Sequence, residues 1–326
     1  MGLFSTVKVN QLNKAILLVV AFSLLGFQGV WAKEIAITFD DSPRKASGYF
    51  DGPTRAKELI QQLKQNQVGQ VAFFSVSSRL DEEGLARLKM YAEAGHIIAN
   101  HTHSHPNINN LSLAEFEKEF LLADKALKQF KNYRKLFRFP YLREGDTLEK
   151  RDGMRRILTE NGYFNAYITL NNYDWYIEHL FQKAIKEGNE VDFKQLGKFY
   201  VDVLMESIEY YDQMAVNHLD RSPKHVLLLH EMDISALFIG NLIKELRNKG
   251  WKIINSEEAY KDKIAEFLIK EPLKFNPGRI GEIARENGQK RKLWHYTLDE
   301  KYLKSKFEKR VLKKSNSLQT KSKEAL

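Results

Sequence analysis

The sequence predicts an α/β fold whose parallel strands curl into a barrel. Short apolar segments alternate with helix-like segments along the chain, and this alternation is typical of parallel sheets with crossover helices. Polar, ligand-like residues recur directly after the apolar segments, as they do at the carboxyl ends of barrel strands. The length of 326 residues and the hydrophobic content of 43% are enough for one large core, so we expect one folded domain with a tail.

Three apolar runs in the first third of the chain are typical of buried strands, at residues 35–39, 71–76 and 96–100. The helices that we expect between and after them have apolar residues at the 3.6-residue period. They cover residues 54–65, 82–94 and 112–130. Ser112 with Glu115 three residues later has the signature of a capping box, which predicts the start of the third helix.

The remaining strands are expected at residues 136–141, 164–170, 226–229 and 251–254. A mostly helical interval precedes the third of these and carries an apolar stripe between Phe193 and Tyr211, which core packing explains. A last helix should cover Ala236–Lys249. Arg138 stands inside an apolar run, where burial is costly unless the guanidinium meets a carboxylate, so we expect it to have an acidic partner.

The N-terminus has the features of a secretory signal. Lys8 and Lys14 precede an apolar run from Ala15 to Phe27, and Val30-Trp31-Ala32 offers small or aliphatic residues for cleavage before Lys33. The apolar run is short for a membrane span, although an uncleaved anchor stays open. We therefore expect an exported protein, located in the periplasm, in the cell envelope or outside the cell. The absence of cysteine excludes disulfides, thiol nucleophiles and cysteine metal sites.

The net charge is +9, and much of the positive excess lies at the C-terminal end, where residues 301–326 hold nine Lys or Arg against two Glu. Such a segment can contact anionic envelope polymers or membrane surfaces. A solvated or disordered tail explains the same charge without a partner. Aromatic residues are not interleaved with the basic ones in the pattern of a nucleic-acid module, so we expect no nucleic acid as partner.

Three of the nine histidines fall within five positions, and this density indicates a metal site. His101 and His105 are four residues apart, so on one helical turn or in a tight loop their rings can close on one ion, while His103 should point elsewhere. A catalytic metal also needs an anionic ligand and an open position. Asp40 and Asp41 follow the first predicted strand and are candidates for that ligand.

Five motifs stand at the ends of predicted strands: Thr38-Phe39-Asp40-Asp41-Ser42-Pro43, His101-Thr102-His103-Ser104-His105-Pro106, Arg138-Phe139-Pro140-Tyr141, Asp174-Trp175 and Leu227-Leu228-Leu229-His230. In this order they resemble the polysaccharide deacetylases, the carbohydrate esterase family 4 that shares the NodB homology domain. The resemblance runs from about Ile35 to about Lys261. It implies an irregular (β/α) barrel with fewer than eight strands.

The resemblance also implies a set of metal ligands and a base. Asp41, His101 and His105 would hold one divalent ion, and Asp40 would take the proton of the attacking water. Arg138 would pair with Asp40, orienting it and holding down its pKa. Zinc is the first choice for two imidazoles and one carboxylate, and cobalt, nickel or manganese fits the same donors.

Four further residues would complete the site by resemblance. The backbone N–H of Tyr141 would bind the oxyanion, and its side chain would contact the substrate. His230 would be the general acid, oriented by Asp174. Trp175 would form a wall of the sugar-binding groove. Together with the metal ligands and the base, these groups provide what amide hydrolysis needs.

The sequence departs from the family pattern at three points. Asn171 stands where an aspartate is frequent, Leu142 stands where glycine is common, and Glu231-Met232 follow His230 in place of a frequent aspartate. None of these changes removes a proposed catalytic group. They leave the identity of the substrate open.

These inferences divide the chain into a signal peptide (1–32), a catalytic domain (33–270) and a basic C-terminal extension (271–326). The expected function is a metal-dependent deacetylase that hydrolyses N-acetyl or O-acetyl groups on a polysaccharide such as peptidoglycan, a chitin-like oligomer or xylan. Two other classes stay open. One is an amidohydrolase of the same superfamily that acts on a small non-sugar amide in a closed pocket. The other is a non-catalytic glycan-binding domain, which would be expected to have lost Asp40 or a metal ligand.

Overall fold

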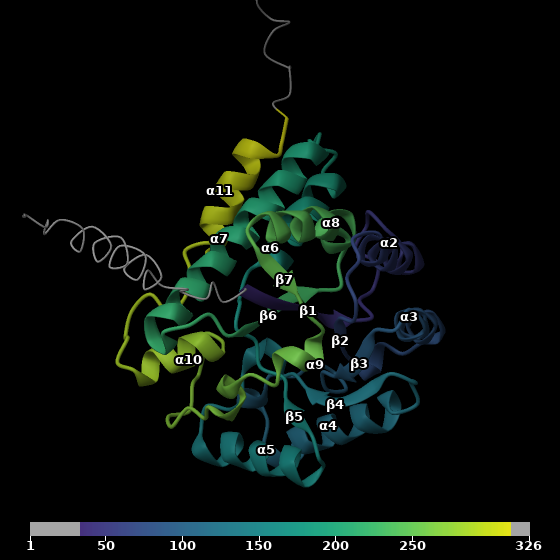
Figure 1. The fold of residues 1–326 in the computed structure, drawn as a ribbon. Helices are drawn as coiled ribbons and strands as arrows, with labels where there is room; N and C mark the ends of the chain where they lie inside the picture. The colour runs from purple at the N-terminus through teal and green to yellow at the C-terminus, as the bar shows by residue number, and fades with distance from the viewer. Residues whose placement is uncertain (1–32, 314–326) are drawn as a thin grey trace, which may run out of the picture. The chain divides into compact units, whose positions relative to one another are not determined.

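The computed structural model describes residues 33–313 and contains a seven-stranded parallel sheet (Figure 1). The strands are β1 (Lys33–Ser42), β2 (Ala72–Ser75), β3 (Ile97–Asn100), β4 (Tyr133–Phe137), β5 (Phe164–Asn165), β6 (Lys224–His230) and β7 (Trp251–Ile253). Their order is β5-β4-β3-β2-β1-β6, and β7 pairs with the first residues of β1. Because every pair is parallel, the carboxyl ends of all strands lie on the same side of the sheet.

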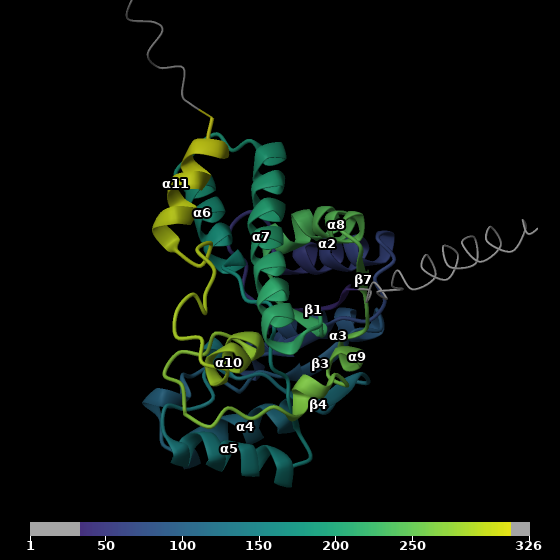
Figure 2. The ribbon, with the colours of Figure 1, turned by 60° about the vertical axis from the view of Figure 1, so that its left-hand side comes forward.

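Helices connect the strands and cover the sheet (Figure 1). They are α2 (Gly52–Gln65), α3 (Glu82–Glu93), α4 (Leu113–Leu127), α5 (Leu148–Glu160), α6 (Asp174–Lys186), α7 (Phe193–Leu219), α8 (Asp233–Asn248), α9 (Ser256–Ala259), α10 (Arg279–Glu286) and α11 (Glu300–Arg310). α2 packs against α3 and α8, and α4 packs against α5. Figure 2 shows the long helix α7 beside α6 and α11.

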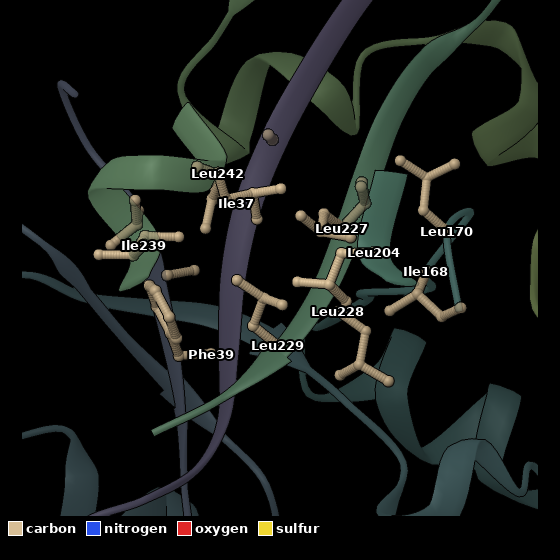
Figure 3. Close-up of a cluster of buried hydrophobic side chains, with 14 of the residues drawn as sticks. Ile37, Phe39, Ile168, Leu170, Leu204, Leu227, Leu228, Leu229, Ile239 and Leu242 are labelled. Carbon is tan, nitrogen blue, oxygen red and sulfur yellow. The ribbon is translucent and has the colours of Figure 1, made fainter. Parts of the chain in front are cut away.

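The core is centred on β1 and β6, which are hydrogen-bonded neighbours. The middle parts of both strands, residues 35–39 and 226–229, are apolar except for Thr38, as strands covered on both faces require. Figure 3 shows Ile37 and Phe39 of β1 packed near Leu227 of β6 and near Ile239 and Leu242 of α8, all of them buried. Each such side chain stabilises the fold by about 1.5–3 kcal/mol. This packing fixes the positions at which β1 and β6 end.

The sheet curls into an irregular barrel. β5 has only two residues, and the chain then turns along β6, where Leu170 forms a parallel bridge with Leu227. The amides of Thr169 and Leu170 both donate to the carbonyl of Val226 at 3.1 Å. This bridge connects the β5 side of the sheet with β6. The prediction of an irregular (β/α) barrel with fewer than eight strands is therefore confirmed for the described residues.

Most predicted elements are present with boundaries shifted by a few residues. The capping box of α4 has both of its hydrogen bonds, from the Glu115 amide to Ser112 and from the Ser112 amide to Glu115. The strand expected at 164–170 is reduced to two residues, because the chain leaves the regular ladder after Asn165. α5 was not predicted, since its many charged residues hide the short apolar face of Met154, Ile157 and Leu158.

The C-terminal segment differs most from expectation. The charge of residues 301–326 predicted a solvated or disordered tail, yet α11 packs on α6 and α7. α10, which precedes the charged residues, packs on α7. Ile280, Leu303 and Phe307 are buried in these contacts. Residues 314–326 and the predicted signal peptide at 1–32 lie outside the described residues. Among residues 33–313, no helix combines the length and the apolar character needed to cross a membrane.

Candidate active site

The predicted site residues gather at the carboxyl ends of the strands. Asp40 and Asp41 lie at the end of β1, and His101 directly follows β3. Arg138 directly follows β4, and His230 is the last residue of β6. The parallel register of β1 and β6 places Asp40 opposite His230. Residues that are nearly two hundred positions apart are thus brought together by the topology of the sheet.

The two metal-ligand histidines lie in a tight loop and not on a helix. Thr102 and His105 have the left-handed φ values of 69° and 62°, which turn the chain back on itself after β3. Asp41 has a similar φ of 70° at the end of β1. His103 points away from the cluster, and its Nδ1 lies 2.9 Å from the hydroxyl of Ser77. The loop therefore presents alternate histidines to the same centre.

Asp41, His101 and His105 form a cluster that fits a divalent metal ion. One ligand atom from each residue lies within 4.8 Å of the other two. The Nε2 atoms of His105 and His101 are 3.1 Å and 3.7 Å from Asp41 Oδ1. That oxygen is buried and has no hydrogen-bond partner, which is costly unless a cation is close to it. Two imidazoles and one carboxylate are one of the donor sets found in catalytic zinc sites.

The protonation states of the cluster favour metal binding. Burial lowers the pKa of His105 and holds the pKa of His101 well below its usual value, so both rings keep a free lone pair at neutral pH. Burial alone would raise the pKa of Asp41, but the electrostatic influence of His105, His230 and Arg44 outweighs burial and holds this pKa well below its ordinary range. The cluster therefore offers one anionic and two neutral ligands.

Two neighbouring groups orient these ligands. The Nδ1 of His101 lies 2.7 Å from the carbonyl oxygen of Arg138, which leaves Nε2 free to face Asp41. Arg44 donates from Nη1 to Asp41 Oδ2 at 2.6 Å, so only Oδ1 of that carboxylate faces the histidines. Arg44 was not among the predicted site residues, because nothing in the local sequence pattern shows that its side chain folds back onto Asp41.

Asp40 is paired with Arg138, and both side chains are buried. The Nη1 of Arg138 donates to Asp40 Oδ1 at 2.9 Å. Burial has the larger effect on the pKa of Asp40, but Arg138 lowers this pKa through its charge and its hydrogen bond, as expected. Burial raises the pKa of Asp40 to about 6, since the loss of water around the carboxylate outweighs the attraction of Arg138. A carboxylate with a pKa close to neutrality is a better general base than an ordinary aspartate.

Arg138 is held on every side. Its guanidinium donates to Tyr260 OH at 3.1 Å and to Thr38 Oγ1 at 3.4 Å, and its Nε donates to the carbonyl of Ala166. It also lies 4.2 Å from the centre of the Phe74 ring. These contacts satisfy a buried charge that would otherwise cost several kcal/mol. Tyr260 is a supporting residue that the sequence motifs did not reveal.

His230 and Asp174 form a second pair next to the first. The Nδ1 of His230 lies 2.8 Å from Asp174 Oδ1, and the His230 amide donates to Oδ2 at 2.8 Å. Burial alone would lower the pKa of His230, but the charge and the hydrogen bond of Asp174 outweigh it, so this pKa lies above its ordinary value. Asp174 is completely buried at the start of α6. The pair can hold a proton ready for a leaving group.

These groups open into one cavity of about 760 Å³. Asp40, Asp41, His101, His105 and His230 all line it. Its walls are formed in addition by Tyr141 and Trp175, as predicted, and by side chains that the motifs did not indicate. The latter include Arg44, Arg143, His179, Gln182, Phe275, Asn276, Trp294 and Leu298. The last four come from the C-terminal segment, for which the sequence had suggested no role.

Tyr141 and Trp175 occupy different walls of this cavity. Tyr141 follows β4 in a left-handed conformation with φ 56°, and its ring lies 4.6 Å from that of His105 in an edge-on contact. Trp175 lies in the first turn of α6 and packs against Tyr173 with ring centres 5.0 Å apart. Both side chains can therefore contact a ligand that enters the cavity.

Comparison with known proteins agrees with the resemblance found in the motifs. The family model described as polysaccharide deacetylase matches residues 29–163. A peptidoglycan-N-acetylglucosamine deacetylase of Bacillus cereus is 28% identical over 151 residues, which are 46% of this chain and 49% of that protein. A peptidoglycan-N-acetylmuramic acid deacetylase of Bacillus subtilis is 31% identical over 110 residues, or 33% and 21% of the two chains. The chain thus spans half or less of the length of these curated relatives.

Among solved structures, the fold is similar to that of a CE4 family pseudoenzyme from Bacillus anthracis. The TM-score is 0.51 at 17% sequence identity, and the alignment covers 70% of this chain and 66% of the other. This likeness supports the same irregular α/β barrel and bears on the fold alone.

Proposed function

We propose that the chain hydrolyses N-acetyl or O-acetyl groups of a polysaccharide with one divalent metal ion. The match of residues 29–163 to the polysaccharide deacetylase family model supports this reaction class. The observation that carries the proposal is the convergence of three groups on one cavity. These are the cluster of Asp41, His101 and His105, the buried base Asp40 and the histidine His230. A protein that only binds glycan has no need for a buried base and a paired histidine beside a metal cluster.

The metal would be held by Asp41 Oδ1 and by the Nε2 atoms of His101 and His105. Zinc is our first choice, and cobalt, nickel or manganese fits the same donors. A divalent ion bound there supplies Lewis acidity, which makes a water molecule easier to deprotonate and polarises the acetyl carbonyl. The orientation of these ligands by Arg44 and by the Arg138 carbonyl fits this role.

Asp40 would act as the base. Its carboxylate takes a proton from the attacking water, whose oxygen forms a bond to the acetyl carbon. Arg138 fixes the carboxylate through Oδ1, and Oδ2 lies 3.9 Å from His101 Nε2 on the side of the metal cluster. The backbone N–H of Tyr141 would stabilise the oxyanion from the wall beside His105.

His230 would act as the acid. Its Nε2 donates a proton to the departing amine or alcohol as the bond from the acetyl carbon to that group breaks, so that acetate and the deacetylated sugar are the products. Asp174 holds Nδ1 and thereby directs Nε2 toward the cavity. The raised pKa of His230 keeps this proton available around neutral pH.

The substrate class follows from the relatives and from the expected export. Both curated relatives are named for deacetylation of peptidoglycan sugars, and this glycan is our first candidate. A secretory signal at 1–32 would carry the protein to the envelope, where such a polymer is found. The cavity of about 760 Å³ is large enough for more than a small amide.

The first test is acetate release from peptidoglycan, from chito-oligosaccharides and from acetylated xylan by the wild type and by Asp40→Asn. The variant keeps the shape and the metal ligands but has no base, so its rate should fall roughly 10²- to 10⁴-fold while its metal content stays the same. Release at the wild-type rate by Asp40→Asn would remove Asp40 from the mechanism. A wild type with bound metal that releases no acetate from any of the three glycans would contradict the proposed activity.

A further inference from the structure

The segment 272–298 supplies part of the cavity wall, and it lies beyond the residues that match the family model. Two of the side chains that this segment adds to the wall are large, aromatic and exposed to solvent. Phe275 is 55% exposed and Trp294 is 43% exposed, although both line the same cavity as the metal cluster. Aromatic surface of this size in contact with water is a common feature of ligand-binding sites.

Buried contacts hold this wall in place. The amide of Arg279 donates to the carbonyl of Ile168 at 2.8 Å, just after the short strand β5. Asn276 accepts from the Gly278 amide at 2.7 Å and donates to the buried carboxylate of Glu282 at 2.8 Å. Phe275 directly precedes this anchored turn, so its ring is presented from a fixed backbone.

A series of ring contacts connects Phe275 with the reaction centre. The rings of His105 and Tyr141 are 4.6 Å apart, and the guanidinium of Arg143 lies 5.9 Å from the Tyr141 ring. The same guanidinium lies 4.8 Å from the Phe275 ring. These contacts place the Phe275 ring on the same side of the cavity as His105 and Tyr141, with the hydrogen-bond donors of Arg143 between Tyr141 and Phe275.

We propose that Phe275 and Trp294 form a subsite for a second sugar unit of the substrate, next to the unit that carries the acetyl group. A pyranose ring has an apolar face of C–H groups, and a solvent-exposed aromatic ring can stack against such a face. The subsite makes the protein selective for oligomeric or polymeric glycan over a single acetylated sugar. This inference rests on the proposed deacetylase function and adds a preference for substrate length.

The test compares an N-acetylated chito-oligosaccharide of four sugars with N-acetylglucosamine. Phe275→Ala and Trp294→Ala should each raise KM for the oligomer about five- to tenfold, the effect of losing one aromatic contact, and lower kcat/KM for the oligomer more than kcat/KM for the single sugar. Tyr296→Ala is the matched control, because Tyr296 is 54% exposed in the same segment but does not line the cavity. It should change none of these values.

The conservative variants Phe275→Tyr and Trp294→Phe keep a flat ring and should retain the wild-type KM for the oligomer. They separate the loss of stacking from a loss of folding, which the melting temperature of each variant also reports. If the alanine variants lose kcat/KM equally on both substrates, or if their KM for the oligomer is unchanged, the subsite is overturned.

A binding measurement separates this proposal from the proposed activity. Titration calorimetry with the deacetylated oligomer requires no turnover. It should show weaker binding to Phe275→Ala than to the wild type even in a protein that releases no acetate. Unchanged binding in that experiment would contradict the subsite, while absent acetate release contradicts only the deacetylase function.

Discussion

Asp40 and Asp41 are neighbours in the chain, yet their pKa values are shifted in opposite directions. Burial dominates at Asp40 and raises its pKa to about 6, whereas His105, His230 and Arg44 lower that of Asp41. Adjacent side chains at the end of a strand point to different surroundings, and this difference divides the roles between them. Pairs of titratable groups whose pKa values are pushed apart are typical of acid–base sites.

The pairing of His230 with Asp174 leads to a prediction about pH. The carboxylate of Asp174 raises the pKa of His230, so His230 keeps its proton to a higher pH than an ordinary histidine. In Asp174→Asn this support is lost, and His230 loses its proton at a lower pH. The alkaline limb of the kcat profile should therefore move to lower pH, with a rate loss at high pH of up to roughly 10²- to 10⁴-fold. An unchanged alkaline limb would show that His230 is not the acid.

For helices and strands, sequence patterns predicted the features that depend only on residues close together in the chain. The capping box at Ser112, most of the apolar strands and four of the five motifs are local signals that the structure has where they were expected. Asp174-Trp175 is the exception among the motifs, because it begins α6 and does not end a strand. Contacts between distant segments were missed. Arg44 folds onto Asp41, and Tyr260 donates from a later segment to support Arg138, but neither has a local signature. The C-terminal segment was not expected to pack on the domain, because its charged residues outnumber the few apolar residues that are buried.

The turn at Gly278 gives a prediction for this segment. Its backbone has φ 88° and ψ 165°, a conformation that costs other residues about 1–3 kcal/mol. A Cβ there would also lie 2.7 Å from Ile168 Cδ1. Gly278→Ala should therefore lower the free energy of unfolding by at least this range in denaturant titrations. Gly288→Ala is the control, because Gly288 has φ 92° but no atom within 4 Å of its Cβ position. A smaller loss in Gly278→Ala than in the control would contradict this account of the turn.

At the scale of the whole folded unit, the parallel sheet is what makes the site. β1, β3, β4 and β6 all end on the same side of the sheet. The end of each strand provides at least one metal-binding, acid–base or supporting side chain of the site. The order of the motifs along the chain could be read from the sequence and indicated the family. The size of the cavity, its C-terminal wall and the net pKa of Asp40 depend on how these segments pack together, and they required the structure.

We propose that Asp41, His101 and His105 hold one divalent metal ion. The most direct test is the metal content of the purified protein, measured by plasma mass spectrometry for the wild type, His105→Ala and His103→Ala. His103 is the matched control, since it lies two residues away but contacts Ser77. We predict that the wild type and His103→Ala bind a single divalent ion per chain and that His105→Ala loses it together with activity. Full metal content in His105→Ala would contradict the account.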